Sequence, residues 1–293
     1  MAQQKHLRPT VRTAFTAALA GAGLLLQAAP ASAADTAPPV LKAPVKASFL
    51  VGGVLDAGTV PDCAPQDQPW DLSTWAPMTF RWSATDTGGP VRYDVLAENT
   101  ATGGDYVLQD SADTSLRDWG TTADQSCGGG NWSTTRWQVD ARDAAGNTAT
   151  AYVGGGRMRL TQEDGRANST SAYAVSPAVR YAGTWSTSTC TCWSAGAVRK
   201  TTTGGASVTA TVPVAAGGVV HLALVMSQAP DRGRAKVYVD GVLSTTIDTG
   251  AATRRHRVIV WDRALGQGTH TVQVVNEGTP GRPRIDVDAF LTN

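Results

Sequence analysis

Few residues of this chain have the types and spacing that catalysis requires. The sequence after residue 33 holds three histidines, His221, His256 and His270, each inside an expected strand. None is spaced from another like a metal-ligand pair, and neither a nucleophile elbow nor a glycine-rich phosphate loop occurs. His221 lies in an apolar run and fits a satisfied core residue better than a base. The sequence therefore predicts no enzyme, with a hydrolase of unfamiliar design acting through His221 or Asp288 as an alternative.

Two carboxylates, Asp286 and Asp288, alternate on the final expected strand and share one of its faces. Neighbouring carboxylates on one strand differ from the opposed acid and base that cleavage of a glycosidic bond requires. The sequence also lacks the basic stripe with aromatic residues that is typical of nucleic-acid binding. Neither function class is therefore expected.

Residues 1–33 are typical of a cleaved export signal. The start is basic, an apolar stretch follows over residues 14–29, and Ala31-Ser-Ala33 fits a cleavage motif. The apolar stretch is short for a bilayer span. We expect a secreted, extracellular protein whose mature chain has no membrane span.

Four cysteines in an exported chain favour disulfides over metal or redox chemistry. They are Cys63, Cys127, Cys190 and Cys192, which allow three pairings. We prefer Cys63–Cys127 with Cys190–Cys192, because this choice keeps each bridge within one expected domain. The second bridge would close a ring around a single intervening residue and so set the shape of one loop.

The balance of charge differs between the two halves of the chain. Residues 34–160 carry 9 basic and 15 acidic side chains, whereas residues 174–293 carry 12 and 7. The second half includes a basic cluster, Arg254-Arg-His-Arg257. One interpretation of this cluster is a solvated start of a strand. A second is binding of anionic glycans or teichoic-acid phosphates. A third is electrostatic contact with the acidic first half of the chain.

Alternating apolar residues and turn signals predict β-strands along the mature chain. In the first half, Met78–Ala84 and Thr135–Ala141 alternate between apolar and polar residues. In the second half, Asp240-Gly241 predicts a tight hairpin, because a type I′ turn needs positive φ at both central positions. Val219–Met226 is apolar on both faces and should be a central strand that is covered on both sides.

The strand pattern divides the mature chain into two all-β units. We expect a first β-sandwich over residues 38–158, a polar linker over 159–173 and a second β-sandwich over 174–293. The expected fold class is therefore all-β, with two tandem β-sandwiches after a cleaved signal peptide.

Three segments of the first unit, Trp82–Gly89, Tyr93–Val95 and Val139–Asn147, have features of a known module. They resemble the fibronectin type III and related Ig-like modules of secreted bacterial proteins. The resemblance implies a seven-stranded sandwich whose role is to space or present another module. A protein-binding or adhesion role is the alternative, through the long loop that holds Trp70 and Trp75 and the loop that holds Cys127.

Five segments of the second unit carry another resemblance: Tyr181–Trp185, Ala206–Val208, Gly233–Gly241, Leu265–Val272 and Ile285–Phe290. They are similar to the galactose-binding-like jelly rolls attached to secreted actinobacterial hydrolases, many of which are carbohydrate-binding modules. The resemblance implies a jelly roll, but the binding loops of this fold differ between members. Our leading hypothesis is a secreted, non-catalytic protein that binds a polysaccharide or cell-wall glycan.

Sugar recognition needs flat aromatic faces and fixed hydrogen-bonding groups. Trp193 and Trp185, near the second disulfide loop, are the first candidates. Tyr238 and Trp261 are the second choice. For Trp185 core packing is the favoured interpretation, while for Trp193 packing and binding are both open. Arg257, from the basic cluster, is the candidate for contact with an anionic ligand.

In modules related by this resemblance, an acidic residue on the last strand can help to hold a structural calcium ion. Asp286 and Asp288 are the candidate ligands, although the first strand here lacks the glutamate-rich start that usually completes such a site. No other cofactor is expected.

Overall fold

The computed structural model describes residues 34–57, 74–99, 104–109, 118–125, 136–156, 158–166 and 175–293. Their regular elements are β-strands, apart from the short 3-10 helix η1 (Ser194–Gly196), which confirms the prediction of sandwich-like β-sheets. Contacts divide the chain into Met1–Asp35 and a compact unit from Thr36 to Asn293. Within the described ranges no helix is long and apolar enough to cross a bilayer. The expected export signal, residues 1–33, lies outside the described residues.

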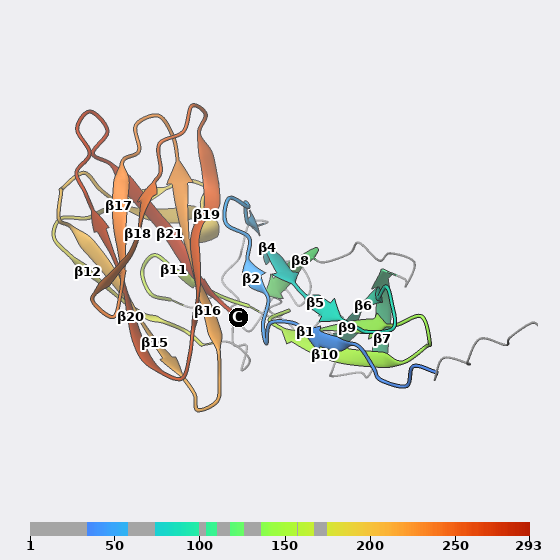
Figure 1. Ribbon diagram of the computed structural model, residues 1–293. Helices are drawn as coiled ribbons and strands as arrows, with labels where there is room; N and C mark the ends of the chain where they lie inside the picture. Colours follow the sequence, from blue (N-terminus) through green and yellow to red (C-terminus); the bar gives the residue numbers. More distant parts are fainter. Residues whose placement is uncertain are drawn as a thin grey trace, which may run out of the picture. The chain divides into compact units, whose positions relative to one another are not determined.

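The first half of the compact unit contains two four-stranded sheets and a short two-stranded one (Figure 1). One sheet has the order β10 (Thr148–Gly154), β9 (Arg136–Arg142), β6 (Arg92–Asn99), β7 (Gly104–Gln109). In the other, the strands that pair with β4 (Thr74–Arg81) are β2 (Ser48–Phe49), β3 (Asp56–Ala57) and β8 (Asp118–Gln125). The two-stranded sheet joins β1 (Val40–Lys42) to β5 (Ser83–Thr85).

Alternation along these strands places their apolar residues in one core. Met78, Phe80 and Trp82 are all buried, as are Trp137 and Val139 on β9. The ring centroid of Phe80 lies 5.7 Å from that of Trp82 and 5.5 Å from that of Trp137. Since every second residue of a strand faces the same side, the alternation in the sequence identified this core correctly.

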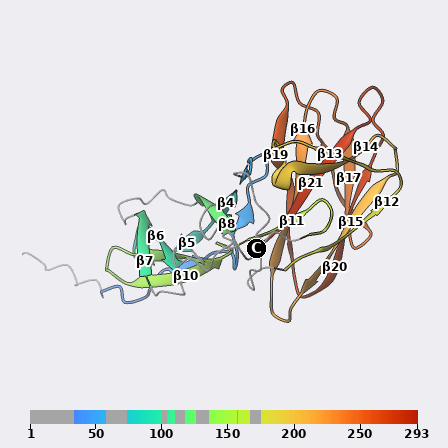
Figure 2. The ribbon, with the colours of Figure 1, turned by 180° about the vertical axis from the view of Figure 1, so that it is seen from behind.

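The second half forms two larger sheets, seen from opposite sides in Figures 1 and 2. The five-stranded sheet has the order β12 (Ala178–Ala182), β15 (Ser207–Val214), β20 (Gly268–Asn276), β17 (Arg234–Val239), β18 (Val242–Asp248). The six-stranded sheet has the order β13 (Ser186–Thr189), β14 (Ala197–Thr201), β21 (Ile285–Thr292), β16 (Val220–Gln228), β19 (Arg255–Leu265), and β21 also pairs with β11 (Arg159–Gln162). Apolar residues of both sheets form one core, so the two sheets are the layers of a β-sandwich.

β16 is the central strand that the sequence predicted. Its first eight residues are buried. Leu222 and Leu224 belong to the core between the two sheets, while Ala223 and Val225 belong to a core on the opposite face. A strand covered on both faces needs apolar residues on both, and the first seven residues of β16 are apolar apart from His221.

The hairpin between β17 and β18 turns at Asp240-Gly241, as predicted. Both residues have positive φ, 51° and 79°, which the mirror-image turn requires. The turn fixes the register of β17, so that Val237 points into the core and Lys236 and Tyr238 lie on the outer face.

The expected linker differs from the structure at its start. Arg159–Gln162 forms β11, which pairs residue by residue with the C-terminal part of β21. Leu160 is fully buried, and the neighbouring polar residues Thr161 and Gln162 are buried as well. The segment looks polar in the sequence, yet its backbone supplies hydrogen-bonding partners to β21. Residues 167–174 of the expected linker lie outside the described residues.

The core of the first half extends into the second half. It also contains residues on the outer face of the six-stranded sheet, namely Ala223, Val225, Ile259, Ala289 and Leu291. Backbone bonds connect the same regions: the Gly52 N–H donates to the Ile259 carbonyl at 2.8 Å, and the Leu55 N–H donates to the Arg257 carbonyl at 2.9 Å. The two halves therefore share buried apolar surface and backbone hydrogen bonds.

Candidate functional site

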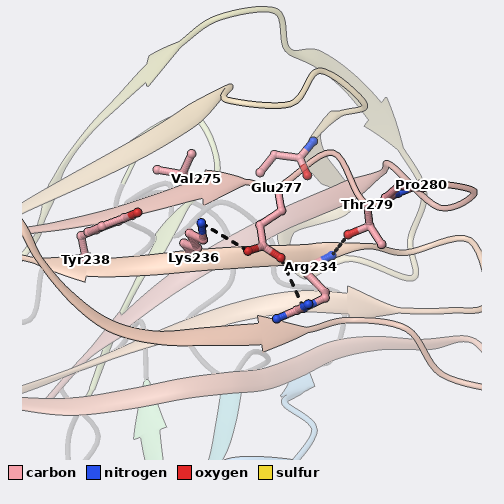
Figure 3. A pocket seen from close by; sticks show the side chains of 8 residues that line it. Arg234, Lys236, Tyr238, Val275, Glu277, Thr279 and Pro280 are labelled. Carbon is pink, nitrogen blue, oxygen red and sulfur yellow. Dashed lines mark hydrogen bonds and ion pairs between the residues drawn. The ribbon is translucent and has the colours of Figure 1, made fainter.

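The outer face of the five-stranded sheet carries a hollow of about 430 Å³, where β17 and β20 meet the loop that follows β20 (Figure 3). Its lining residues are Arg234, Lys236, Tyr238, Val275, Asn276, Glu277, Thr279 and Pro280. The antiparallel register places Lys236 opposite Val275 and Tyr238 opposite Gln273. The hollow is therefore built largely on two paired strands, which hold its side chains at fixed spacing.

Charged groups and one aromatic ring meet in this hollow. Glu277 faces two cations: its Oε2 lies 3.3 Å from Nε of Arg234, and its Oε1 lies 3.6 Å from Nζ of Lys236. Figure 3 shows the hydroxyl end of Tyr238 directed toward Lys236. Tyr238 is half-buried, so part of its ring remains accessible. The arrangement offers a ring face, several N–H donors and one carboxylate to a ligand.

Asn276 fixes the start of the loop that forms one wall of the hollow. Its side-chain amide donates to the carbonyl oxygens of Thr203 at 3.1 Å and Pro283 at 2.9 Å. Its Oδ1 accepts the Gly278 N–H at 3.1 Å. Asn276 is itself almost fully buried, so the bend of the loop is set by hydrogen bonds that water does not compete for.

Gly233 allows the far end of the same loop to approach β17. A Cβ atom at this position would lie 2.3 Å from the carbonyl oxygen of Arg282. The close approach lets the Arg234 N–H donate to Oγ1 of Thr279 at 2.8 Å. The wall is therefore held at both ends, and a ligand would meet a hollow that is already ordered.

Among the four aromatic candidates from the sequence, Tyr238 lines the hollow. Trp193 and Trp261 are only 8% and 7% exposed, so neither offers the open ring face that sugar stacking needs. Trp261 packs in the core between the sheets. Trp185 is half-buried and lies edge-on against Tyr181, with ring centroids 4.9 Å apart. Trp193 and Trp261 therefore lack an open ring face, whereas Trp185 is partly accessible and its role as a platform stays a prediction.

Trp193 is instead buried next to the second disulfide loop. The predicted Cys190–Cys192 bond is present, with the Cα atoms 5.1 Å apart. The indole N–H of Trp193 donates to Oγ of Ser227 at 3.0 Å. Arg257 donates from Nη2 to the carbonyl oxygens of Thr191 at 2.6 Å and Trp193 at 3.3 Å. Arg257 therefore helps to position this loop, and the ligand contact expected of it stays a prediction.

Asp286 does not fit the expected calcium site. It is fully buried, and two arginines bind its carboxylate. Oδ2 accepts Nε–H of Arg232 at 2.6 Å, and Oδ1 accepts Nε–H of Arg284 at 2.6 Å. Two guanidinium groups already neutralise this carboxylate and would repel a cation placed beside it.

Asp288 has a different environment from Asp286. Its Oδ1 accepts the Ser194 N–H at 2.9 Å, while its buried Oδ2 has no hydrogen-bond partner among the described residues. Burial raises the pKa of Asp288 well above its usual range. Burial also raises the pKa of Glu163, which follows β11 beside Asp288. Two carboxylates fall short of the six to eight oxygen ligands of calcium, so calcium binding stays a prediction.

Histidines of the second sandwich take part in buried contacts. Nδ1 of His221 lies 2.9 Å from Oδ2 of Asp262, and His221 is only 8% exposed. Nδ1 of His256 lies 3.3 Å from Oγ of Ser227, but Ser227 is fully buried. A nucleophile must reach its substrate, so this serine and histidine do not form an accessible catalytic pair.

Some expected residues lie outside the described part of the chain. They are Cys63 and Cys127, the first preferred disulfide, and Trp70, from the loop considered for protein binding. Trp75, expected in the same loop, lies instead in β4, where it pairs with Asp56 and Asp124. The first disulfide and the protein-binding role therefore stay predictions.

Sequence reasoning missed Arg234, Glu277 and Thr279 as site residues. Arg234 and Thr279 are more than 40 residues apart in the sequence. They become neighbours through the pairing of β17 with β20. The available signal was the turn-forming segment Asn276-Glu-Gly-Thr-Pro280 directly after a strand. This segment predicts a loop, but it does not indicate which residues of another strand the loop approaches.

A scan against protein-family models found no match to this sequence, and a search of curated proteins found none either.

Several solved structures show a weak likeness in fold. One is the CBM36-1 domain of a multidomain xylanase from the hindgut metagenome of Trinervitermes trinervoides, with 13% identity, a TM-score of 0.30 and coverage of 46% of this chain and 96% of that one. Another is a family 35 carbohydrate-binding module from Clostridium thermocellum, with 12% identity, a TM-score of 0.32 and the same coverage. An exo-beta-1,3-galactanase from Phanerochaete chrysosporium has 14% identity and a TM-score of 0.33, covering 74% of this chain and 54% of that one. At these scores the likeness carries no argument about ligand or activity.

Proposed function

We propose that this protein is a secreted, non-catalytic carbohydrate-binding protein that holds a polysaccharide or cell-wall glycan against the outer face of β17 and β20. The observation that carries the proposal is the hollow itself, in which the ring of Tyr238 lies beside fixed polar groups. Export rests on the basic, apolar and small-residue pattern of residues 1–33.

The chemistry of the hollow suits a sugar ring. The C–H faces of a pyranose pack against aromatic rings, and its hydroxyls need donors and acceptors at fixed positions. Tyr238 supplies the ring, Arg234 and Lys236 supply donors, and Glu277 and Thr279 supply acceptors. A volume of about 430 Å³ is within the range of small-molecule sites.

The same residues favour binding over bond cleavage. Hydrolysis of a glycosidic bond uses two carboxyl groups on opposite sides of that bond. Among the residues that line the hollow, Glu277 is the only one with a carboxylate. This carboxylate faces two cations and can accept hydrogen bonds from hydroxyls, which a binding site requires.

Retention of the full chain on insoluble polysaccharides and isolated cell walls tests the proposal. We expect the unchanged protein to be retained on at least one of them. Replacing Tyr238→Ala should weaken retention about tenfold or more, because the stacking surface is lost.

Tyr152→Ala is the matched control for this experiment. Tyr152 is a 48%-exposed tyrosine on β10 of the first sandwich, with the Arg136 guanidinium 3.9 Å from its ring centroid. Its removal should leave retention unchanged. Folded protein that is retained on none of the polymers, or equal losses in both variants, would contradict the proposal.

A further inference from the structure

The hollow around Tyr238 has an excess of positive charge. Arg234 and Lys236 both face the single carboxylate of Glu277, so one positive charge is left without a counter-charge in the hollow. The nitrogen–oxygen distances of 3.3 Å and 3.6 Å also exceed the about 2.7–2.9 Å of a close charge-assisted hydrogen bond. Lys236 carries three N–H donors and Arg234 five. Most of these donors are therefore not used by Glu277.

These two cations are accessible to a ligand. The side chains of Arg234 and Lys236 are 48% and 43% exposed, whereas that of Glu277 is 21% exposed. The neighbouring Arg282 is already paired, since its Nη2 lies 2.7 Å from Oδ2 of Asp248. Asp248 also lies opposite Arg234 and interacts with it. The three cations Arg234, Lys236 and Arg282 therefore meet two carboxylates, and one positive charge remains next to the ring of Tyr238.

The basic cluster in the sequence is less suited to an anion. Arg255 donates from Nη2 to the Gly52 carbonyl at 2.9 Å, and Arg257 donates to the Thr191 carbonyl at 2.6 Å. Both guanidinium groups thus serve contacts within the chain. Arg254 is exposed, with its Nη2 4.0 Å from Oδ1 of Asp231. Of the two places, the hollow combines free cationic donors with an aromatic ring, so we place anion binding there.

We propose, building on the carbohydrate-binding function above, that the hollow selects an acidic sugar unit. The sugar ring would pack on Tyr238, and its carboxylate or phosphodiester oxygens would lie between Lys236 and Arg234. An anion there would accept hydrogen bonds from the N–H groups of Lys236 and Arg234 that Glu277 does not use. The planar guanidinium suits anions with two oxygens. A neutral sugar would gain the ring contact but leave the excess charge unbalanced.

The test compares polymers that differ only in charge. Full-length protein is titrated with polygalacturonate, alginate and glucuronoxylan, and with the carboxyl-reduced form of each. A phosphate arm compares cell walls that contain teichoic acid with walls from which hydrofluoric acid has removed the phosphodiesters. We expect at least one acidic form to bind about tenfold more tightly than its neutral counterpart. The difference should shrink between about 20 mM and about 300 mM NaCl, because salt screens exposed charges.

The variants assign the preference to named groups. Lys236→Met should weaken binding of the acidic form about tenfold and leave the neutral form unchanged. Glu277→Gln should strengthen binding of the acidic form about threefold, because a competing negative charge is removed. The control Lys42→Met removes the same charge from an exposed position on β1 in the first sandwich and should change neither. Thermal unfolding confirms that each variant is folded.

The possible failures are distinguishable. Equal binding of acidic and neutral forms would overturn the preference for acidic sugars and leave the carbohydrate-binding function intact. An acidic preference that Lys42→Met reduces as much as Lys236→Met would remove the hollow as its origin. No binding to any polymer, acidic or neutral, would overturn both the proposed function and this inference.

Discussion

Asp286 and Asp288 lie two residues apart on β21, yet their surroundings differ. Arginines bind the carboxylate of Asp286, whereas burial favours the protonated form of Asp288 and so raises its pKa. Asp286 is bound by Arg232 and Arg284, and Arg232 is only 1% exposed. Replacing Asp286→Asn would remove the buried counter-charge of Arg232 and leave only the more exposed Asp231 beside its guanidinium, which should cost about 3 kcal/mol, the lower end for a broken buried pair. We expect urea unfolding at neutral pH to show this loss. Asp248→Asn, which affects a more exposed pair with Arg282, should cost less than about 1 kcal/mol.

The second half of this prediction concerns Asp288, whose pKa is raised by burial. A carboxyl group with a higher pKa in the folded state stabilises the fold when protonated, and this contribution is lost as the pH rises through the folded-state pKa. Asp288→Asn keeps an acceptor for the Ser194 N–H but does not titrate. Its free energy of unfolding, relative to the unchanged protein, should therefore rise as the pH increases from about 4, the pKa of an unfolded Asp, through the raised folded-state pKa of Asp288. A difference that stays constant over this range would contradict the assignment.

The site residues were predictable only in part. Tyr238 followed from alternation on a strand with a clear turn, because the sequence fixes both the period and the end of that strand. The burial of Trp193 could not be predicted in this way. A tryptophan beside a disulfide loop has the same local sequence whether its side chain faces Ser227 or water. Glu277 also required the pairing of two distant strands, which local patterns do not specify.

At the level of elements, strongly patterned strands were predicted and weakly patterned ones were missed. The first seven residues of β16 are apolar apart from His221, and the hairpin from β17 to β18 has a specific turn. β11 contains one large apolar residue, Leu160, among polar neighbours, and β13 (Ser186–Thr189) contains none. Short polar segments form strands when a neighbouring strand has unpaired backbone N–H and C=O groups. The local sequence does not show where such a neighbouring strand will lie.

β11 should therefore be needed for the stability of the second sandwich. A chain of residues 158–293 keeps this strand, whereas residues 174–293 lack it, and both lack the first half. The shorter chain loses the backbone pairing of β11 with β21 and the position of Leu160 opposite Leu291. Leu160 belongs to the core shared with the first half, so only part of its burial remains in these chains, and we expect a loss of about 1 kcal/mol in the free energy of unfolding. Equal stability of the two chains in urea would show that β11 contributes little.

For the whole molecule, the shared core predicts cooperative unfolding. Val225 and Ile259, from the second sandwich, belong to the same buried cluster as Phe49 and Trp137, from the first half. Separating the halves would expose this apolar surface to water. Calorimetry should therefore show one transition, with the calorimetric enthalpy equal to the van't Hoff enthalpy. Two resolved transitions would contradict this prediction.

The Cys190–Cys192 bridge also bears on how the protein can be made in the laboratory. It closes a ring around Thr191 alone, and the loop-entropy relation assigns such a ring only about 1.5 kcal/mol, against about 3 kcal/mol for a 15-residue loop. Arg257 and Trp193 hold the same segment by contacts that do not depend on the sulfur–sulfur bond. Recombinant production in a reducing bacterial cytoplasm should therefore yield a folded second sandwich, and an oxidising glutathione buffer could then add this bond to the purified material.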